Sequence, residues 1–206
     1  MDLISAFTPP PLITPPTEPL QGLSRRQVLR SVGALTLLAL AGSSHAKVDN
    51  SFWEKPRTIR LYRPKTNEAV ESLYWRDGVL AESRYNELCW LLRDVRANAH
   101  VQMHPRLLDL LYGIQGYLEA LTGKPAWLTV TDAYRTPGTN TELIEEGIPA
   151  SRASLHMYGG AADLKVSGLS AKQLAAVAKY FGGGGVGVYR GGHVHVDIGR
   201  VREWRG

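Results

Sequence analysis

The sequence predicts an α+β fold in which helices pack on a mainly antiparallel sheet. Residues 57–63 and 69–75 alternate apolar and polar side chains, which is typical of strands with one buried face. Residues 82–96 instead repeat apolar side chains every three or four positions, as an amphipathic helix does. Alternation returns at 193–198, close to the C-terminal end. Strands, helices and further strands in this order favour one α+β domain.

The first part of the domain is expected to be a hairpin followed by two helices. Residues 64–68 separate the first two strands as a hairpin loop, and Asp-Gly at 77–78 forms the next turn. The helix at 82–96 follows. A second helix begins at the His-Pro of 104–105, since proline is favoured in the first turn, and ends at the Gly-Lys-Pro of 123–125.

The second part is expected to add strands and two shorter helices. A strand at 127–131 runs into a loop at 132–138, and a short helix follows at 141–146. Ser170 is a suitable N-cap for a helix at 171–180. The remaining strands are expected at 161–166, 186–189 and 193–198.

Residues 1–46 are predicted to be a twin-arginine signal peptide with a proline-rich extension, and residues 47–206 to be the folded domain. Arg25-Arg26 precede a short apolar stretch at 32–41, and small residues at 44–46 offer a cleavage site. The apolar stretch is shorter than the ~20 residues that span a bilayer. The paired arginines favour export by the twin-arginine translocase to the periplasm. A chance Arg-Arg pair before a buried helix and an uncleaved membrane anchor are the alternatives.

Charge and cysteine content narrow the class of protein. The formal net charge of +5 suits attraction to anionic polymers such as cell wall, but no dense run of Lys and Arg indicates a nucleic-acid partner. Cys89 is the only cysteine, so no intrachain disulfide can form, and we expect a buried, inert thiol. The glycines at 182–185 lack the Lys-Ser/Thr of a phosphate-binding loop. We expect the protein to be a monomer.

Five polar residues in the C-terminal third carry the chemistry. His156 and Asp163 are followed by His193, His195 and Asp197. Two histidines and a carboxylate are a typical ligand set for catalytic zinc, with a fourth position open for water. A single helix would separate His156 from Asp163 by ~10 Å, too far for bonds of ~2 Å to one ion. We therefore expect His156 on a loop, a turn at the two glycines that follow, and Asp163 on a strand.

The alternation at 193–198 strengthens the metal interpretation. Period two places His193, His195 and Asp197 on one face of a strand and three aliphatic residues on the other. Such polar groups are rarely buried without partners, and a metal ion is an economical partner. Each residue alone would more often be a surface, cap or turn residue, so only the combination indicates zinc. A structural metal and no metal are the alternatives.

These motifs resemble those of the zinc D-Ala-D-Ala carboxypeptidase and murein endopeptidase family, which has the Hedgehog/D,D-peptidase fold. That family carries Ser-X-His-X6-Asp, matched here by Ser154, His156 and Asp163. A later strand carries the third ligand, matched by His195. The resemblance therefore implies that these two histidines and Asp163 hold a Zn²⁺ ion.

Further segments extend the resemblance over residues 57–204. An Ala-Tyr-Arg loop at 133–135 and Gly-Val-Gly-X-Tyr at 185–189 are similar to family segments. The YcbK-like exported endopeptidases, which also tend to carry twin-arginine signals, are the most similar branch. The resemblance implies peptidoglycan stem peptides as the substrate. It also implies that Arg135 binds a substrate carboxylate or the developing oxyanion, where its ordinary role would be a surface salt bridge.

One departure from the family affects the general base. The carboxypeptidase branch has a glutamate three residues before the last ligand, where this chain has Gly192. His193 and Asp197 are the candidates to replace it. His193 is favoured because a neutral imidazole accepts a proton near pH 7. Asp197 could instead be the carboxylate that orients a histidine.

The resemblance thus implies a periplasmic zinc metallopeptidase, a murein endopeptidase that hydrolyses peptide cross-links of peptidoglycan. Two other functions stay open: a D,D-carboxypeptidase that trims stem peptides, and a non-catalytic zinc-stabilised domain that binds cell wall. An exported domain without metal is the last alternative, and the metal content of the protein separates it from the others.

Overall fold

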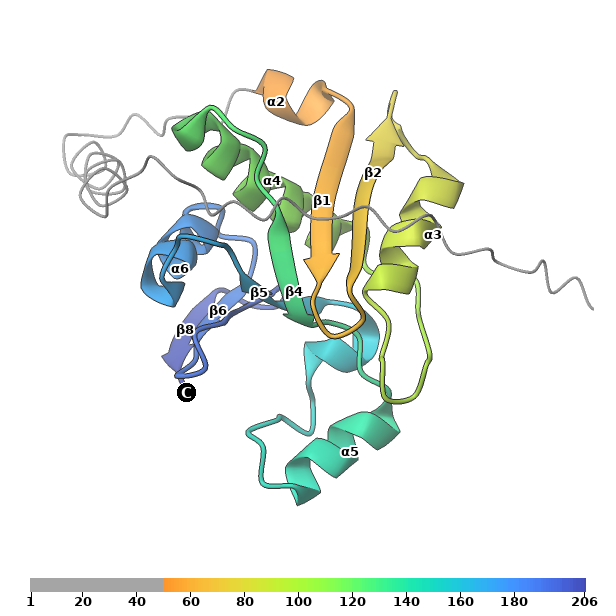
Figure 1. Cartoon of the computed structure of the whole chain (residues 1–206), viewed down its shortest axis with the longest axis vertical. Coiled ribbons are helices and arrows are strands. Elements are labelled where there is room, and N and C mark those ends of the chain that lie inside the picture. Colours follow the sequence, from red (N-terminus) through yellow and green to blue (C-terminus); the bar gives the residue numbers. More distant parts are fainter. Residues whose placement is uncertain (1–49) are drawn as a thin grey trace, which may run out of the picture.

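The computed structural model describes residues 50–206, which form a single sheet with helices packed against it (Figure 1). The predicted signal segment, residues 1–46, lies outside the described residues. The strand order across the sheet is β3-β2-β1-β4-β5-β7-β6-β8. Within residues 50–206, no helix is both long enough and apolar enough to cross a membrane.

Strands and helices are interspersed along the described part of the chain. The strands are β1 (Arg57–Arg63), β2 (Glu68–Arg76), β3 (Val79–Leu80), β4 (Leu128–Asp132), β5 (Ala161–Lys165), β6 (Gly185–Val188), β7 (Val194–Asp197) and β8 (Arg202–Arg205). The helices are α2 (Asn50–Glu54), α3 (Glu82–Leu91), α4 (Pro105–Thr122), α5 (Pro137–Glu145), α6 (Ala171–Tyr180) and the 3-10 turn η1 (Leu155–Tyr158). All the predicted strands are present, and their ends differ from the prediction by at most one residue.

The pairing of the strands confirms a mainly antiparallel sheet. All hydrogen-bonded neighbours in the described chain run antiparallel, except for β1 with β4 and β6 with β8. A mixed α+β architecture is therefore confirmed.

The helices give one face of the sheet its hydrophobic core. Apolar side chains of α3, α4 and α6 join one buried cluster with residues of the central strands. Leu164 of β5 and Val194 of β7 belong to this cluster. Because side chains alternate along a strand, Asp163 and His195 project from the opposite face. The fold thus keeps the apolar core and the polar residues of interest on separate sides of β5 and β7.

Local signals explain where α4 begins and ends and where α6 begins. The side chain of His104 caps α4 by accepting a hydrogen bond from the N–H of Arg106, and Gly123 ends the helix in the left-handed conformation. Ser170 caps α6 in a reciprocal pair with Gln173. The predicted starts of both helices are confirmed.

The environment of Cys89 agrees with a structural role. The thiol is buried on α3 and accepts a hydrogen bond from the N–H of Met103. Burial raises the pKa of this thiol, which keeps it protonated and a weak nucleophile.

The prediction of a helix over residues 82–96 is wrong beyond Leu91. The buried guanidinium of Arg63 donates to the carbonyl oxygens of Leu91 and Arg93, and Asp94 forms an isolated β-bridge. These long-range contacts take the backbone groups that further helical turns would have used. A periodic apolar pattern in the sequence cannot reveal such competition.

The short helix predicted at 141–146 begins earlier, at Pro137. The hydroxyl of Thr136 accepts a hydrogen bond from the N–H of Thr139, and proline is favoured in the first turn. The loop predicted at 132–138 is correspondingly shorter. Sequence reasoning did not predict α2, β3 or β8, which are too short to show a clear period.

Candidate metal centre and cleft

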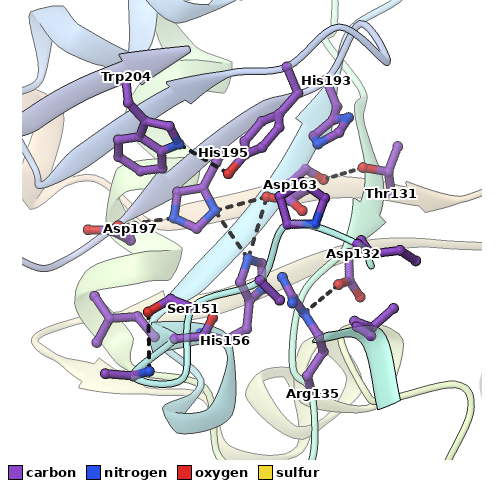
Figure 2. A pocket seen from close by; sticks show the side chains of 18 of the residues that line it. Thr131, Asp132, Arg135, Ser151, His156, Asp163, His193, His195, Asp197 and Trp204 are labelled. Atoms are coloured by element: carbon purple, nitrogen blue, oxygen red, sulfur yellow. Dashed lines mark hydrogen bonds and ion pairs between the residues drawn. The ribbon is translucent and has the colours of Figure 1, made fainter. Parts of the chain in front are cut away.

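A cleft of about 590 Å³ opens on the face of the sheet that carries the polar side chains. Strands β4, β5, β7 and β8 line it on one side, and the segment between α5 and η1 lines it on the other (Figure 2). The structure brings all the predicted site residues together along this cleft: Arg135, His156, Asp163, His193, His195 and Asp197.

Pairing of β5 with β7 sets two of the three predicted ligands side by side. Asp163 and His195 are direct cross-strand partners, and both side chains are buried. Cross-strand neighbours on one face have Cβ atoms about 4.5–5.5 Å apart, which is short enough for two side chains to share one ion. The prediction that Asp163 lies on a strand is confirmed.

His156 reaches the same point from η1, a 3-10 turn, and not from the irregular loop that was predicted. Ser154 caps the turn, and Gly159 ends it with φ of +64°. A Cβ atom at Gly159 would lie 3.2 Å from backbone atoms of Gln102 and Met103, so the close chain approach also requires glycine. The chain then turns back into β5, as the two glycines predicted.

Three potential ligand atoms converge at the floor of the cleft. Nδ1 of His195 lies 2.9 Å from Oδ1 of Asp163 and 3.1 Å from Nε2 of His156. The remaining separation, from Nε2 of His156 to Oδ1 of Asp163, is 3.5 Å. Atoms bonded at 2.0–2.1 Å to one tetrahedral ion lie about 3.3–3.4 Å apart. The three atoms therefore form a triangle of the size that a tetrahedral metal site requires.

The outer partners of the two histidines decide which ring nitrogens can bind a metal. Nδ1 of His156 contacts the carbonyl oxygen of Ala133, which can only accept, so Nδ1 carries the proton. Nε2 of His195 lies 3.0 Å from Oδ2 of Asp197, and an ionised carboxylate likewise only accepts. In the neutral rings, Nε2 of His156 and Nδ1 of His195 consequently carry lone pairs that face Asp163.

Two lone pairs and a carboxylate oxygen within 3.5 Å require a cation between them. Hydrogen bonds and charges from His156 and His195 overcome the effect of burial and hold the pKa of Asp163 well below its usual range. Burial lowers the pKa of His195, but its contacts with Asp163 and Asp197 outweigh burial and raise that pKa. A proton and a metal ion therefore compete for Nδ1 of His195. The residues present fit a metal ion.

Asp197 lies behind His195 and is the most deeply buried residue of the site, with no solvent exposure. Its oxygens accept hydrogen bonds from His195, from both terminal nitrogens of Arg202, and from the N–H groups of Gly185 and Gly199. Burial alone would raise the pKa of Asp197, but these donors hold it below the usual range. The carboxylate is thus arranged to orient His195, which is one of the two roles predicted for it.

His193 stands at the edge of the cleft, one residue before β7 and not within it as predicted. Its half-buried ring stacks on Tyr189, with centroids 4.7 Å apart and ring planes at 10°. Burial lowers the pKa of His193 and, with the charges of Lys165 and His195, outweighs the charge of Asp163, which raises it. The imidazole is consequently neutral near pH 7 and able to accept a proton.

Arg135 is buried at the other side of the cleft from β8 (Figure 2). Its Nε lies 2.7 Å from Oδ2 of Asp132, and its Nη1 donates to Asn140 at 3.3 Å. The backbone N–H of Arg135 donates to the carbonyl oxygen of His156, which links the arginine to the ligand turn. Next to it, Tyr134 packs on the core and does not line the cleft.

Gly192 explains why a glutamate is absent three residues before the last ligand. Its φ is +78°, in the left-handed region, and it closes a turn by donating to the carbonyl oxygen of Tyr189. Residues other than glycine rarely adopt this backbone conformation, so the turn favours glycine over glutamate. Whatever accepts the proton in this chain must come from another position.

Sequence reasoning missed several residues of the cleft, of which Asp132, Arg202 and Trp204 contact the predicted site residues. Arg202 and Trp204 alternate with Glu203 and Arg205 in β8, which was the only available signal. The indole ring of Trp204 lies 5.1 Å from the ring of His195, and its Nε1 donates to the hydroxyl of Tyr189.

Comparison with known proteins agrees with this site. The family profile described as peptidoglycan L,D-endopeptidase MepK matches residues 51–204. The peptidoglycan L,D-endopeptidase MepK of Escherichia coli K12 is 32% identical over 151 residues, which cover 73% of this chain and 81% of the relative. The protein of the same name from Shigella flexneri has the same identity and coverage.

A more distant relative gives a similar result. The probable peptidoglycan L,D-endopeptidase MepK of Haemophilus influenzae is 29% identical over 153 residues, or 74% of this chain and 81% of the relative. The matched region includes every residue that lines the metal centre. The chain belongs to the peptidase M15 family of the peptidoglycan L,D-endopeptidase MepK.

Proposed function

We propose that this protein is a zinc-dependent endopeptidase that hydrolyses L,D peptide bonds in the cross-links of peptidoglycan. The observation that carries the proposal is the convergence of His156 Nε2, Asp163 Oδ1 and His195 Nδ1 at the floor of an open cleft. The names of the relatives supply the substrate and the bond type, and the fixed tautomers supply the metal site.

His156, Asp163 and His195 would hold the zinc ion. Bound there, zinc supplies a Lewis acid that acidifies water and polarises a carbonyl group. The protein leaves the cleft side of the ligand triangle open, so that a water molecule and a peptide can approach. Asp197 keeps the His195 ring in the tautomer that binds metal.

His193 is the proton acceptor in this proposal. It is neutral near pH 7, lines the same cleft as the ligands, and is held in place by Tyr189. It takes a proton from the attacking water and delivers it to the nitrogen of the leaving amine. Asp197, the other predicted candidate, has all its oxygens engaged behind His195.

Arg135 binds negative charge opposite His193. Its guanidinium is buried and linked to Asp132, so little reorganisation is needed when a substrate carboxylate or a developing oxyanion approaches. The fork of donors on an arginine suits planar carboxylates in particular.

The test compares zinc-loaded and chelator-treated protein on intact peptidoglycan, with soluble products identified by mass spectrometry. Zinc-dependent loss of cross-linked dimers is expected, and product masses identify the bond. Release of terminal D-alanine alone would support the D,D-carboxypeptidase instead. Unchanged muropeptides, in protein shown to hold one zinc per chain, would support a non-catalytic wall-binding domain.

We also propose that the protein adopts the Hedgehog/D,D-peptidase fold and acts as a monomer in the periplasm after twin-arginine export. Support comes from the order of the motifs on the sheet, the peptidoglycan substrate of the relatives and the Arg25-Arg26 pair. Replacing both arginines by lysine should retain the protein in the cytoplasm, as fractionation would show. Undiminished export would exclude this route.

A further inference from the structure

We infer that the C-terminal strand β8 positions both histidines of the His193-X-His195 motif, an inference that rests on the proposed function. Arg202 fixes His195 through Asp197, and Trp204 fixes His193 through Tyr189. Neither β8 residue takes part in metal ligation or proton transfer. Each acts through one intermediate side chain, although the Arg202 guanidinium also lies 4.8 Å from the centroid of the Trp204 ring and that ring lies 5.1 Å from the ring of His195. Zinc affinity reports on the first effect and kcat on the second.

Two glycines of β6 give the β8 side chains room to reach the site. β6 and β8 pair in parallel, with Gly185 opposite Arg202 and Gly187 opposite Trp204. A Cβ atom at Gly187 would lie 2.5 Å from the indole ring, and one at Gly185 would lie 2.4 Å from Nη1 of Arg202. A Cβ atom at either position would therefore displace the β8 side chain that lies over it. The glycines of this strand therefore allow both β8 side chains to lie flat over it.

The first arm is the series of contacts that leads from Arg202 through Asp197 to His195. Nη2 of Arg202 lies 2.7 Å from Oδ2 of Asp197, and Nη1 lies 3.1 Å from Oδ1, so the pair is bidentate. Oδ2 of Asp197 also accepts from Nε2 of His195 at 3.0 Å. A bidentate pair fixes the plane of the carboxylate, and the carboxylate in turn fixes the plane of the imidazole. Arg202 thereby controls the direction of the His195 lone pair.

The second arm is the series of contacts that leads from Trp204 through Tyr189 to His193. Nε1 of the indole donates to the hydroxyl of Tyr189 at 3.1 Å. The phenol ring stacks almost parallel on the His193 ring, with centroids 4.7 Å apart. Figure 2 shows Trp204 and His193 on the same side of the three residues His156, Asp163 and His195. The stacked phenol restricts rotation of an imidazole that stands outside any regular strand.

Zinc affinity tests the first arm without any measurement of activity. In the purified full-length chain, Arg202→Met should weaken Zn²⁺ binding about 10- to 100-fold in competition with a chromophoric chelator, as losses of outer partners do. Arg202→Lys should lie between wild type and Arg202→Met, because a single ammonium keeps the charge but not the fork. Arg205→Met on the other face of β8 is the matched control and should bind as wild type does.

The melting temperature of the metal-free variants separates positioning from folding. Arg202→Met should melt below the wild-type temperature, because buried Asp197 loses two donors, but a cooperative transition well above the assay temperature shows that the fall in zinc affinity is not a loss of the fold. Wild-type affinity in this variant would overturn the first arm. If Arg202→Met does not fold, the decision passes to Arg202→Lys, whose affinity must then be reduced.

Steady-state kinetics test the second arm. Trp204→Phe and Tyr189→Phe each remove one partner of the hydrogen bond but keep an aromatic ring. Both should bind zinc within about threefold of wild type, yet lose roughly tenfold or more in kcat with little change in KM, because misplaced groups slow the chemical step. Gly187→Ala should show the same pattern, since it displaces the indole.

The outcomes distinguish this inference from the proposed function. Unchanged kcat in Trp204→Phe, or a loss of zinc equal to that of Arg202→Met, would overturn the second arm. If the wild-type protein hydrolyses no peptidoglycan, the proposed function and the second arm fail together. The first arm is then still decided by zinc affinity alone.

Discussion

Nδ1 of His195 lies 2.9 Å from Oδ1 of Asp163 across the β5–β7 ladder, and no proton belongs between them in the neutral tautomer that Asp197 selects. A lone pair facing a carboxylate is stable only when a cation lies between the two. Either a proton or a metal ion can supply that charge. The predictions below separate what each side chain around this cation contributes.

Asp163→Asn should abolish stable zinc binding while the fold is retained. The amide keeps the shape of the carboxylate but removes its charge, and its NH₂ group can face the ligand centre. We expect zinc affinity to fall by more than the 10–100-fold typical of outer partners. Chelator competition measures the affinity, and muropeptide release should fall in parallel.

The matched control for Asp163→Asn is Asp77→Asn. Asp77 lies in the turn after β2 with a side chain 87% exposed, and asparagine tolerates its left-handed backbone. Both its zinc affinity and its activity should equal those of wild type. Zinc retained by Asp163→Asn at wild-type affinity would contradict the assignment of Asp163 as a ligand.

His193→Gln should stop turnover but leave the metal in place. General-base catalysis contributes about 10²–10⁴-fold, so kcat should fall by that order. The zinc content should stay at one per chain, because the three proposed ligands are His156, Asp163 and His195. Loss of zinc would make His193 a ligand, and undiminished kcat would return Asp197 to consideration as the base.

Arg135→Met should lower kcat/KM by roughly 100-fold, the scale reported for loss of one oxyanion donor. The kinetic parameters also tell the two predicted roles apart. A higher KM at unchanged kcat means that Arg135 binds a carboxylate of the substrate, whereas a lower kcat means that it stabilises the oxyanion. A change of less than twofold in kcat/KM would mean that Arg135 serves only in its salt bridge with Asp132.

The convergence of the proposed metal ligands was predictable from sequence, because the strand period fixes the face on which two of them lie. Alternation in β5 and β7 places Asp163 and His195 on the face opposite Leu164 and Val194, and the structure confirms this. His156 was predictable as a neighbour because the Gly159-Gly160 turn returns the chain to β5. Local rules of this kind do not depend on distant parts of the chain.

The outer parts of the site were not predictable, because they depend on contacts far apart in the sequence. The sequence of β8 does not indicate that Arg202 contacts Asp197, because the strand has only four residues and shows no clear period. The end of α3 was misplaced for the same reason, since Arg63 of β1 takes the carbonyl oxygen of Leu91. The role of Asp197 was left open until its partners were known.

Substitutions of two glycines should show what the site turn and the segment just before β6 require. At Gly192, a Cβ atom would have open space, with Nζ of Lys165 4.0 Å away, so Gly192→Ala should cost only about 1–2 kcal/mol for the left-handed backbone. At Gly184, a Cβ atom would lie 1.9 Å from the carbonyl oxygen of Asp197, so Gly184→Ala should destabilise far more. Urea unfolding measures the free energy of unfolding of both variants. Equal losses of stability would contradict the view that only Gly184 is required by a close backbone contact.

Asp94 should make the stability of the cleft wall sensitive to acid. Its Oδ2 accepts hydrogen bonds from the N–H and hydroxyl of Thr136 at the start of α5, and Oδ1 accepts from the N–H groups of Arg96 and Ala97. Burial alone would raise the pKa of Asp94, but these donors outweigh it and the pKa is lowered. The carboxylate therefore stabilises the folded state above pH ~4, the unfolded value.

This stabilisation is lost as the pH falls through the lowered pKa of folded Asp94. Asp94→Asn should cost about 1–3 kcal/mol at neutral pH, because the amide has one acceptor oxygen for four donors and its NH₂ group faces further donors. Since protonation of wild-type Asp94 removes the same interactions, the difference between the two proteins should shrink as the pH is lowered below ~4. Urea unfolding of both proteins from pH 7 down to acid measures it. A difference that stays constant with pH would mean that the charge of Asp94 contributes nothing to holding α5 beside the cleft.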